Sequence, residues 1–243
     1  RALTDAGRAL SFFTVAAEDR STRHPNESVR ERDSRWVEIL TPLVKGWCTE
    51  ISMEVTSLGV QVHGGMGFIE STGVSQLMRD SRILPIYEGT NGIQALDFIG
   101  RKCLRDGGSG LSSIVDEMHK TVDATKSGSE RVIVLIESLK CAANQCTDAI
   151  NEVLTRPRRS PEIAYNFLMV FGNSISFWLL VRLAISAQRC IDEGAQDTLY
   201  EQKIVTAQFF TDHILSRNDG FLKIILSEKS TLNRISSDHF IRP

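Results

Sequence analysis

Apolar residues recur at steps of three and four along most of the 243-residue chain, which is the pattern of amphipathic α-helices. Residues 1–20 form the first such run, and His24-Pro25-Asn26 is expected to end it before a charged loop that extends to Arg32. A second run over residues 36–62 predicts a long helix. Thr41-Pro42 would restart that helix as cap and first residue, because proline is tolerated there.

Helical periodicity continues through the rest of the chain. Shorter helices are predicted for residues 73–80 and 90–104. Ser127 and Glu130 have the spacing of a capping box before a long helix that should end at Arg156-Pro157. A buried helix should follow from Ser160, and Asp197 should cap the last long helix. Since no window alternates strongly with a period of two, the chain is expected to be all-α.

Residues 164–187 are apolar enough to be compared with a membrane span. Burying polar side chains in hydrocarbon is costly, so the polar residues in this stretch favour a helix at the centre of a protein bundle, and membrane association is not expected. These polar residues are Asn166, Asn173, Ser174, Ser176 and Arg182.

Residues 105–110 have the sequence Arg-Asp-Gly-Gly-Ser-Gly, which is typical of a linker. We therefore expect two packed helical units, the first comprising residues 1–106 and the second residues 109–243. The chain begins with Arg1 inside an apparent helix and no signal sequence is visible, so we interpret it as part of a longer polypeptide.

Composition limits the classes of function. Hydrophobic residues make up 42% and charged residues 24% of the chain, as in soluble globular proteins. A formal net charge of -2 argues against a nucleic-acid partner. The five cysteines include no CxxC pair, which favours buried thiols in a reducing compartment over disulfides or a zinc site.

Glu88 is the first candidate for chemistry, because it lies between Tyr87 and Gly89 directly before a predicted helix. By spacing alone, the simpler interpretation is that the Glu88 carboxylate interacts with the dipole of the following helix or forms half of a capping box. Gly89 would let a ligand approach the backbone closely, and Pro85 and Ile86 would make the approach apolar. A water-poor pocket raises the pKa of a carboxyl group and makes it a better proton acceptor.

A glycine-rich turn, Gly64-Gly65-Met66-Gly67, is the second candidate. Its simplest interpretation is a helix C-cap followed by a tight turn. Uncovered backbone N–H groups could also contact a diphosphate, and Gln61 could add an amide contact. No predicted strand precedes the turn, so a Rossmann site is a poor interpretation. His63 is expected to be packed or solvent-facing, outside catalysis.

Several separated motifs occur in an order that resembles one family. The motifs are Leu40-Thr41-Pro42-Leu43-Val44-Lys45, residues 61–68, Arg79-Asp80 and Ile86-Tyr87-Glu88-Gly89-Thr90. Over residues 1–104 the chain is similar to the carboxyl-terminal helical bundle of flavin-dependent acyl-CoA dehydrogenases, without the first helix of that bundle. Residues 87–97 and Gly100-Arg101-Lys102 resemble bacterial members with an appended helical domain, which residues 109–243 would form.

The resemblance implies the α,β-desaturation of an acyl-CoA thioester. Glu88 would be the base that removes the pro-R proton from Cα, while a hydride leaves Cβ for N5 of FAD, and Gly89 would lie beside the substrate. Two segments match flavin-contacting segments of the family, the first of which reaches the FAD of a neighbouring subunit. They are Gln61, Val62, His63, Gly64 and Gly65, and then Thr90, Asn91 and Gly92.

The resemblance also implies a homodimer or homotetramer that passes electrons to an electron-transferring flavoprotein. The location it implies is the cytoplasm of a bacterium, or the mitochondrial matrix of a eukaryote. The family's amino-terminal helical domain and middle β-domain have no counterpart in residues 1–243, so this chain alone is expected neither to hold FAD tightly nor to turn over. Two alternatives remain open. One is an acyl-CoA oxidase that uses oxygen, and the other is a non-catalytic helical module for interaction or oligomerisation.

Overall fold

The computed structural model describes residues 1–126, 128–230 and 235. The described residues form helices and turns without a strand, which confirms the all-α prediction. The α-helices are α1 (Ala2–Arg23), α2 (Glu27–Val62), α3 (Gly65–Phe68), α4 (Val74–Ser81), α5 (Asn91–Ile99), α6 (Ser109–Ala124), α7 (Glu130–Thr155), α8 (Ser160–Asp192), α9 (Thr198–His213) and α10 (Asn218–Leu226), with short turns η1 (Glu70–Thr72), η2 (Gly100–Leu104), η3 (Pro157–Arg159) and η4 (Leu215–Arg217) between them.

The start of α2 corrects the predicted charged loop. Asn26 is the N-cap, and its side-chain oxygen accepts a hydrogen bond from the Ser28 N–H at 2.9 Å. An asparagine cap satisfies one of the free N–H groups of a helix start. The helix therefore begins at Glu27, and the charged residues up to Arg32 form its first turns.

Thr41 and Pro42 do not restart the helix. The Thr41 hydroxyl donates to the Val37 carbonyl at 2.7 Å, so it serves the preceding turn and caps nothing. Pro42 is buried inside α2. A proline in a helix interior removes one backbone hydrogen bond, and the buried apolar face of α2 around Leu40 and Leu43 offsets that loss.

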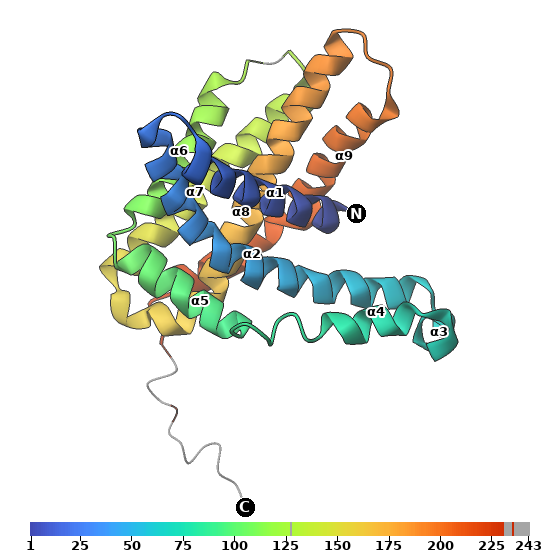
Figure 1. Cartoon of the computed structure of the whole chain (residues 1–243), viewed down its shortest axis with the longest axis horizontal. Helices are drawn as coiled ribbons and strands as arrows, with labels where there is room; N and C mark the ends of the chain where they lie inside the picture. Colours follow the sequence, from blue (N-terminus) through green and yellow to red (C-terminus); the bar gives the residue numbers. More distant parts are fainter. Residues whose placement is uncertain (127, 231–234, 236–243) are drawn as a thin grey trace, which may run out of the picture.

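The second half of α2 projects from the body together with α4, and α3 lies at the tip of this pair (Figure 1). We call this projection, residues 52–81, the arm. The Thr56 and Ser81 hydroxyls, one from each helix, are 2.9 Å apart. The chain returns along α4 to the body, where α5 begins at Asn91.

Helix α8 runs through the centre of the body, and every residue from 167 to 181 is buried. It is long and apolar enough to cross a membrane, but 83% of its most apolar window is buried inside the protein. Asn173 on this helix is paired on both sides, because it accepts from Trp47 Nε1 at 2.8 Å and donates to Asn218 at 2.9 Å. The buried Ser176 hydroxyl has no hydrogen-bond partner among the described residues. The predicted helix at the centre of a bundle is confirmed.

Helix α8 approaches α2 closely through glycines. A Cβ at Gly172 would lie 2.1 Å from Cδ1 of Trp47, and one at Gly46 would lie 2.8 Å from a methyl group of Leu168. The buried residues form a cluster that continues from α1 and α2 into α8 and α9. A boundary between residues 106 and 109 stays a prediction, and the two segments share this core.

Two further predictions concern caps and thiols. Asp197 accepts from the Leu199 N–H at 2.8 Å, which confirms it as the cap of α9. Ser127, the other predicted cap, lies outside the described residues.

All five cysteines are free thiols. Cys103 and Cys146 are buried, and burial raises the pKa of each thiol to about 12. Cys141 is exposed, so the expectation that the thiols are buried is wrong for this residue.

Candidate active site

The loop between α4 and α5 carries the predicted catalytic residue. Its first half is a turn in which the N–H groups of Ile86 and Tyr87 both donate to the Ile83 carbonyl, at 2.9 and 3.1 Å. Its ends are joined by the Asn91 N–H, which donates to the Pro85 carbonyl at 3.0 Å. Glu88 therefore lies in a closed loop at the point where the arm meets the body.

The backbone at Glu88 and Gly89 is left-handed, with φ values of 53° and 85°. Glu88 is the only non-glycine residue with a positive φ in the described part of the chain. Such a conformation is uncommon for a residue with a Cβ. Gln94 Nε2 donates to the Glu88 carbonyl at 3.2 Å and so ties the loop to α5.

The Glu88 side chain is exposed, and its neighbours Ile86 and Tyr87 are 45% and 46% exposed. Glu88 does not cap α5, because the Thr90 hydroxyl is the cap and accepts from the Ile93 N–H at 3.3 Å. A capping box needs a glutamate or glutamine three residues after the cap. Ile93 is at that position, so no capping box forms. The structure therefore removes the simpler interpretation of Glu88 as half of a capping box.

Asn91 directs its side chain into the protein. The residue is 5% exposed. Its side-chain oxygen accepts hydrogen bonds from Lys45 Nζ at 3.0 Å and from the Thr49 hydroxyl at 2.9 Å. Its side-chain amide donates to the Glu50 carboxylate at 2.9 Å. Of the three residues in the second predicted flavin segment, Thr90 and Gly92 are exposed. Asn91 therefore offers a ligand neither its side chain nor its N–H group, which donates to the Pro85 carbonyl.

Lys45 lies behind the Glu88 loop, between two carboxylates. The pKa of Lys45 lies below its usual value, because the effect of burial is larger than the opposing effect of the negative charges of Glu88 and Glu50. The Tyr165 hydroxyl is 3.4 Å from Glu50, and burial, with the charge of Glu50, raises the pKa of Tyr165 to about 12. Sequence reasoning missed this cluster, although polar residues at positions 45, 49 and 50 interrupt an otherwise apolar helix face and could have marked it.

The first predicted flavin segment lies at the tip of the arm (Figure 1), where Gln61, Val62, His63, Gly64 and Gly65 are all exposed. His63 Nδ1 is 2.8 Å from the Gly59 carbonyl, within its own helix. Helices rise about 1.5 Å per residue, so Gln61 lies roughly 24 Å along α2 from Lys45. One copy of the chain thus keeps the two predicted flavin segments well apart.

The glycines of the turn differ in what the fold requires of them. Gly64 has a φ of 58°, and a Cβ at Gly67 would lie 2.2 Å from the Val60 carbonyl oxygen, so both are needed for the turn. Gly65 has neither constraint, since a Cβ there would meet no heavy atom within 4 Å. The cap-and-turn interpretation therefore explains Gly64 and Gly67 and leaves Gly65 as backbone open to a ligand or partner.

Two family models match the chain in succession. The model described as "Acyl-CoA dehydrogenase, C-terminal domain" matches residues 1–104, and the one described as "Acetyl-CoA dehydrogenase C-terminal like" matches residues 114–236. The 3-methylmercaptopropionyl-CoA dehydrogenase of Ruegeria pomeroyi is 41% identical over 219 residues, which are 88% of this chain and 37% of that protein. The broad-specificity linear acyl-CoA dehydrogenase FadE5 of Mycobacterium tuberculosis is 27% identical over 251 residues, or 98% and 40% of the two chains.

Two solved structures share the fold. An acyl-CoA dehydrogenase complexed with FAD from Bacillus anthracis aligns with a TM-score of 0.71 at 21% identity, covering 96% of this chain and 42% of that one. Caenorhabditis elegans ACDH-11 in complex with C11-CoA aligns with a TM-score of 0.72 at 18% identity, covering 94% and 39%. The chain spans about two fifths of the length of these relatives. With family models matched on both of its successive segments, the chain belongs to the acyl-CoA dehydrogenase family and corresponds to its carboxyl-terminal region.

Proposed function

We propose that the complete protein is an FAD-dependent acyl-CoA dehydrogenase and that this chain supplies its catalytic base. The observation that carries the proposal is the left-handed backbone of Glu88, held in a closed loop at the foot of the arm. Strained conformations persist only where the surroundings enforce them, and they gather at functional sites. A carboxylate without a capping role, placed in this way, is suited to proton abstraction.

In the proposed reaction, a Glu88 carboxylate oxygen accepts the proton from the carbon next to the thioester. Gln94 fixes the backbone of that residue, and Lys45 places a positive charge behind the loop. A positioned general base contributes roughly 10²- to 10⁴-fold to a rate. FAD, when bound, would supply the acceptor for the hydride that leaves the β carbon. The apolar side chains of Ile86 and Tyr87 would adjoin the acyl group and help to exclude water.

The residues present fit a flavin in two places. Gly65 offers uncovered backbone at the tip of the arm, and Thr90 and Gly92 offer exposed surface beside Glu88. Because these places are roughly 24 Å apart along α2, we propose that they serve two different flavins in a homodimer or homotetramer. The 243-residue chain alone would then purify without stoichiometric flavin, and bound FAD in that preparation would contradict this part of the proposal.

The names of relatives support the substrate class and the acceptor. Relatives in two bacteria are named for 3-methylmercaptopropionyl-CoA and for linear acyl-CoAs, so we propose an acyl-CoA substrate. A protein from Acetobacterium woodii, 38% identical over 58 residues, is named as a subunit of a caffeyl-CoA reductase-Etf complex. That name supports an electron-transferring flavoprotein as the acceptor.

A panel of acyl-CoAs tests the proposed function. The complete protein is mixed with 3-methylmercaptopropionyl-CoA and with linear acyl-CoAs of increasing length, with and without an artificial electron acceptor. We expect the dye to be reduced by at least one thioester, with little hydrogen peroxide when the dye is absent. Rapid peroxide formation would identify an oxidase instead. Absence of both flavin and turnover would favour the non-catalytic module.

A further inference from the structure

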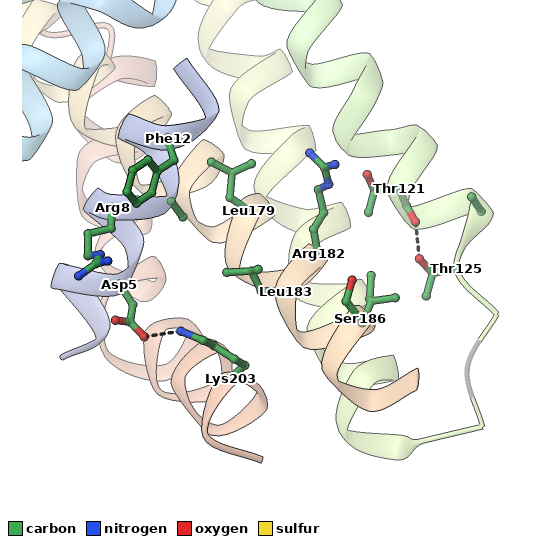
Figure 2. Close-up of a pocket in the computed structure, with 13 residues that line it drawn as sticks. Asp5, Arg8, Phe12, Thr121, Thr125, Leu179, Arg182, Leu183, Ser186 and Lys203 are labelled. Atoms are coloured by element: carbon green, nitrogen blue, oxygen red, sulfur yellow. Dashed lines mark hydrogen bonds and ion pairs between the residues drawn. The ribbon is translucent and has the colours of Figure 1, made fainter. Parts of the chain in front are cut away.

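An open cavity of about 840 Å³ lies at the surface between α1, α6, α8 and α9 (Figure 2). No residue of the Glu88 loop lines it, and Phe12 in its wall is 65% exposed. Cavities of this size hold small molecules. In Figure 2 the α8 side chains Leu179 and Arg182 lie between Phe12 on α1 and Thr121 on α6. Its lining combines apolar side chains with one hydroxyl and with cationic groups: Phe12, Leu179 and Leu183, then Ser186, then Arg8 and Arg182.

Arg182 is held in the cavity by aromatic rings. Its Cζ lies 5.3 Å from the ring centroid of Trp178 and 6.0 Å from that of Phe13. Trp178 is itself fixed, because its Nε1 donates to the Thr121 hydroxyl at 2.8 Å. Cation–π contacts orient a guanidinium without using its N–H donors. The planar fork of Arg182 is thus positioned, and no hydrogen bond to another described residue occupies its donors.

The cavity has an excess of positive charge. Lys203 pairs with Asp5 at 3.1 Å, and Asp5 is the carboxylate in the lining. Arg8 rests on the ring of Phe12 at 5.9 Å. Within the described ranges, neither Arg8 nor Arg182 has a carboxylate oxygen within 4.0 Å of its guanidinium. Two guanidinium groups therefore face the cavity without a counter-ion from the described chain.

We propose that this cavity binds an amphipathic anion, a carboxylate or phosphate head group on an apolar body. The head group would accept hydrogen bonds from Arg182, since guanidinium matches the geometry of both oxyanions. Ser186 is four residues further along α8 and lies on the same face, where its hydroxyl can also reach the head group. The apolar body would lie along Phe12, Leu179 and Leu183. This site shares no residue with the proposed acyl-CoA site and does not depend on it.

Isothermal titration of the complete protein with octanoate, octyl phosphate and octanol tests the proposal. We expect saturable binding of at least one of the two anions, and the comparison between them identifies the preferred head group. The Arg182→Gln variant should bind that anion roughly tenfold or more weakly, because one charge-assisted contact is lost. Arg189→Gln, an exposed arginine on the same helix outside the cavity, should bind as the parent does.

A second variant covers the case in which Arg182→Gln unfolds. Ser186→Phe fills part of the cavity and keeps every charge, so it should also abolish saturable binding while circular dichroism stays native. The proposal is wrong if neither anion binds the parent protein saturably, or if octanol binds as tightly as the anions. If the anion still binds with parental affinity to every one of the Arg182→Gln and Ser186→Phe variants that folds, its site lies elsewhere and the proposal is also wrong.

Discussion

The backbone at Glu88 and Gly89 stores conformational energy next to the proposed chemistry. A left-handed conformation costs a residue with a Cβ about 1–2 kcal/mol, so Glu88 keeps it only because the loop is tied on both sides. The Asn91 N–H bonds to the Pro85 carbonyl, and Gln94 bonds to the Glu88 carbonyl. These contacts make the direction of the Glu88 side chain a property of the folded loop.

Gly89→Ala should disturb this loop. Gly89 has a φ of 85°, and an added Cβ would lie 2.9 Å from Gln94 Nε2, so the variant must both strain the backbone and displace Gln94. We expect the free energy of unfolding to fall by about 1–2 kcal/mol, measured by urea denaturation. Gly92→Ala is the matched control, because its Cβ meets only Thr90 Oγ1 at 3.8 Å. An equal loss of stability in both variants would contradict the explanation.

Residue spacing predicted the position of Glu88 but not the orientation of its neighbours. The resemblance implies that Thr90, Asn91 and Gly92 contact a flavin, and the structure directs the Asn91 side chain inward to Lys45, Thr49 and Glu50. Consecutive residues at a helix start point in different directions, so a motif that is continuous in sequence need not present one surface. The inward hydrogen bonds depend on α2, which sequence alone does not place beside α5.

At the scale of helices, apolar periodicity predicted the long elements and failed at their ends. The buried stripe of α2 begins at Asp33 and Trp36, so the polar turns from Glu27 to Arg32 carried no apolar signal. Asn26 could have marked the true start as a capping residue. The sequence predicts Pro42 as a first helical residue because a sequence does not show packing. Buried in the bundle, Pro42 is tolerated inside the helix.

The close contact between α2 and α8 predicts that a larger residue at Gly172 lowers the stability of the fold. Trp47 is completely buried against Gly172, where any Cβ would overlap its ring at 2.1 Å. Gly172→Ala should therefore lower the free energy of unfolding by about 1–3 kcal/mol through overpacking, as measured by chemical denaturation with tryptophan fluorescence.

Gly59→Ala serves as the control for this variant. Gly59 lies inside α2, and an added Cβ would meet no heavy atom within 4 Å. Alanine is the better helix former, so this variant should gain about 0.5–1 kcal/mol. Equal behaviour of the two glycine variants would show that α8 does not pack on α2 as described.

The whole molecule combines a shared core with a projecting arm. The linker composition of residues 105–110 predicted two units, and it could not show that α8 packs on α1, α2 and α5. A chain that ends after Gly107 would expose Trp47 and Phe98, which are completely buried. The side chains at the end of the arm are different, because Val62 and Phe68 remain 83% and 80% exposed.

The exposed apolar side chains at the end of the arm predict a contact with a second copy of the protein. Such a contact agrees with the proposal that the arm reaches the flavin of a neighbouring subunit. Phe68→Asp in the complete protein should shift light scattering toward smaller species and reduce the FAD retained on purification. Leu199→Asp is the control, since it changes another exposed apolar residue, in the first turn of α9, where a carboxylate is favourable. Unchanged assembly and flavin content in Phe68→Asp would argue against the arm as an interface.

Flavin reduction by the Glu88→Gln variant of the complete protein, measured under anaerobic conditions with exposed Glu193→Gln as the control, tests the role of Glu88 most directly. Both variants should retain FAD and bind acyl-CoA. Bleaching of the flavin absorbance should slow by roughly 10²- to 10⁴-fold in Glu88→Gln alone. Flavin reduction by Glu88→Gln at the rate of the parent protein would contradict the assignment of Glu88 as the base.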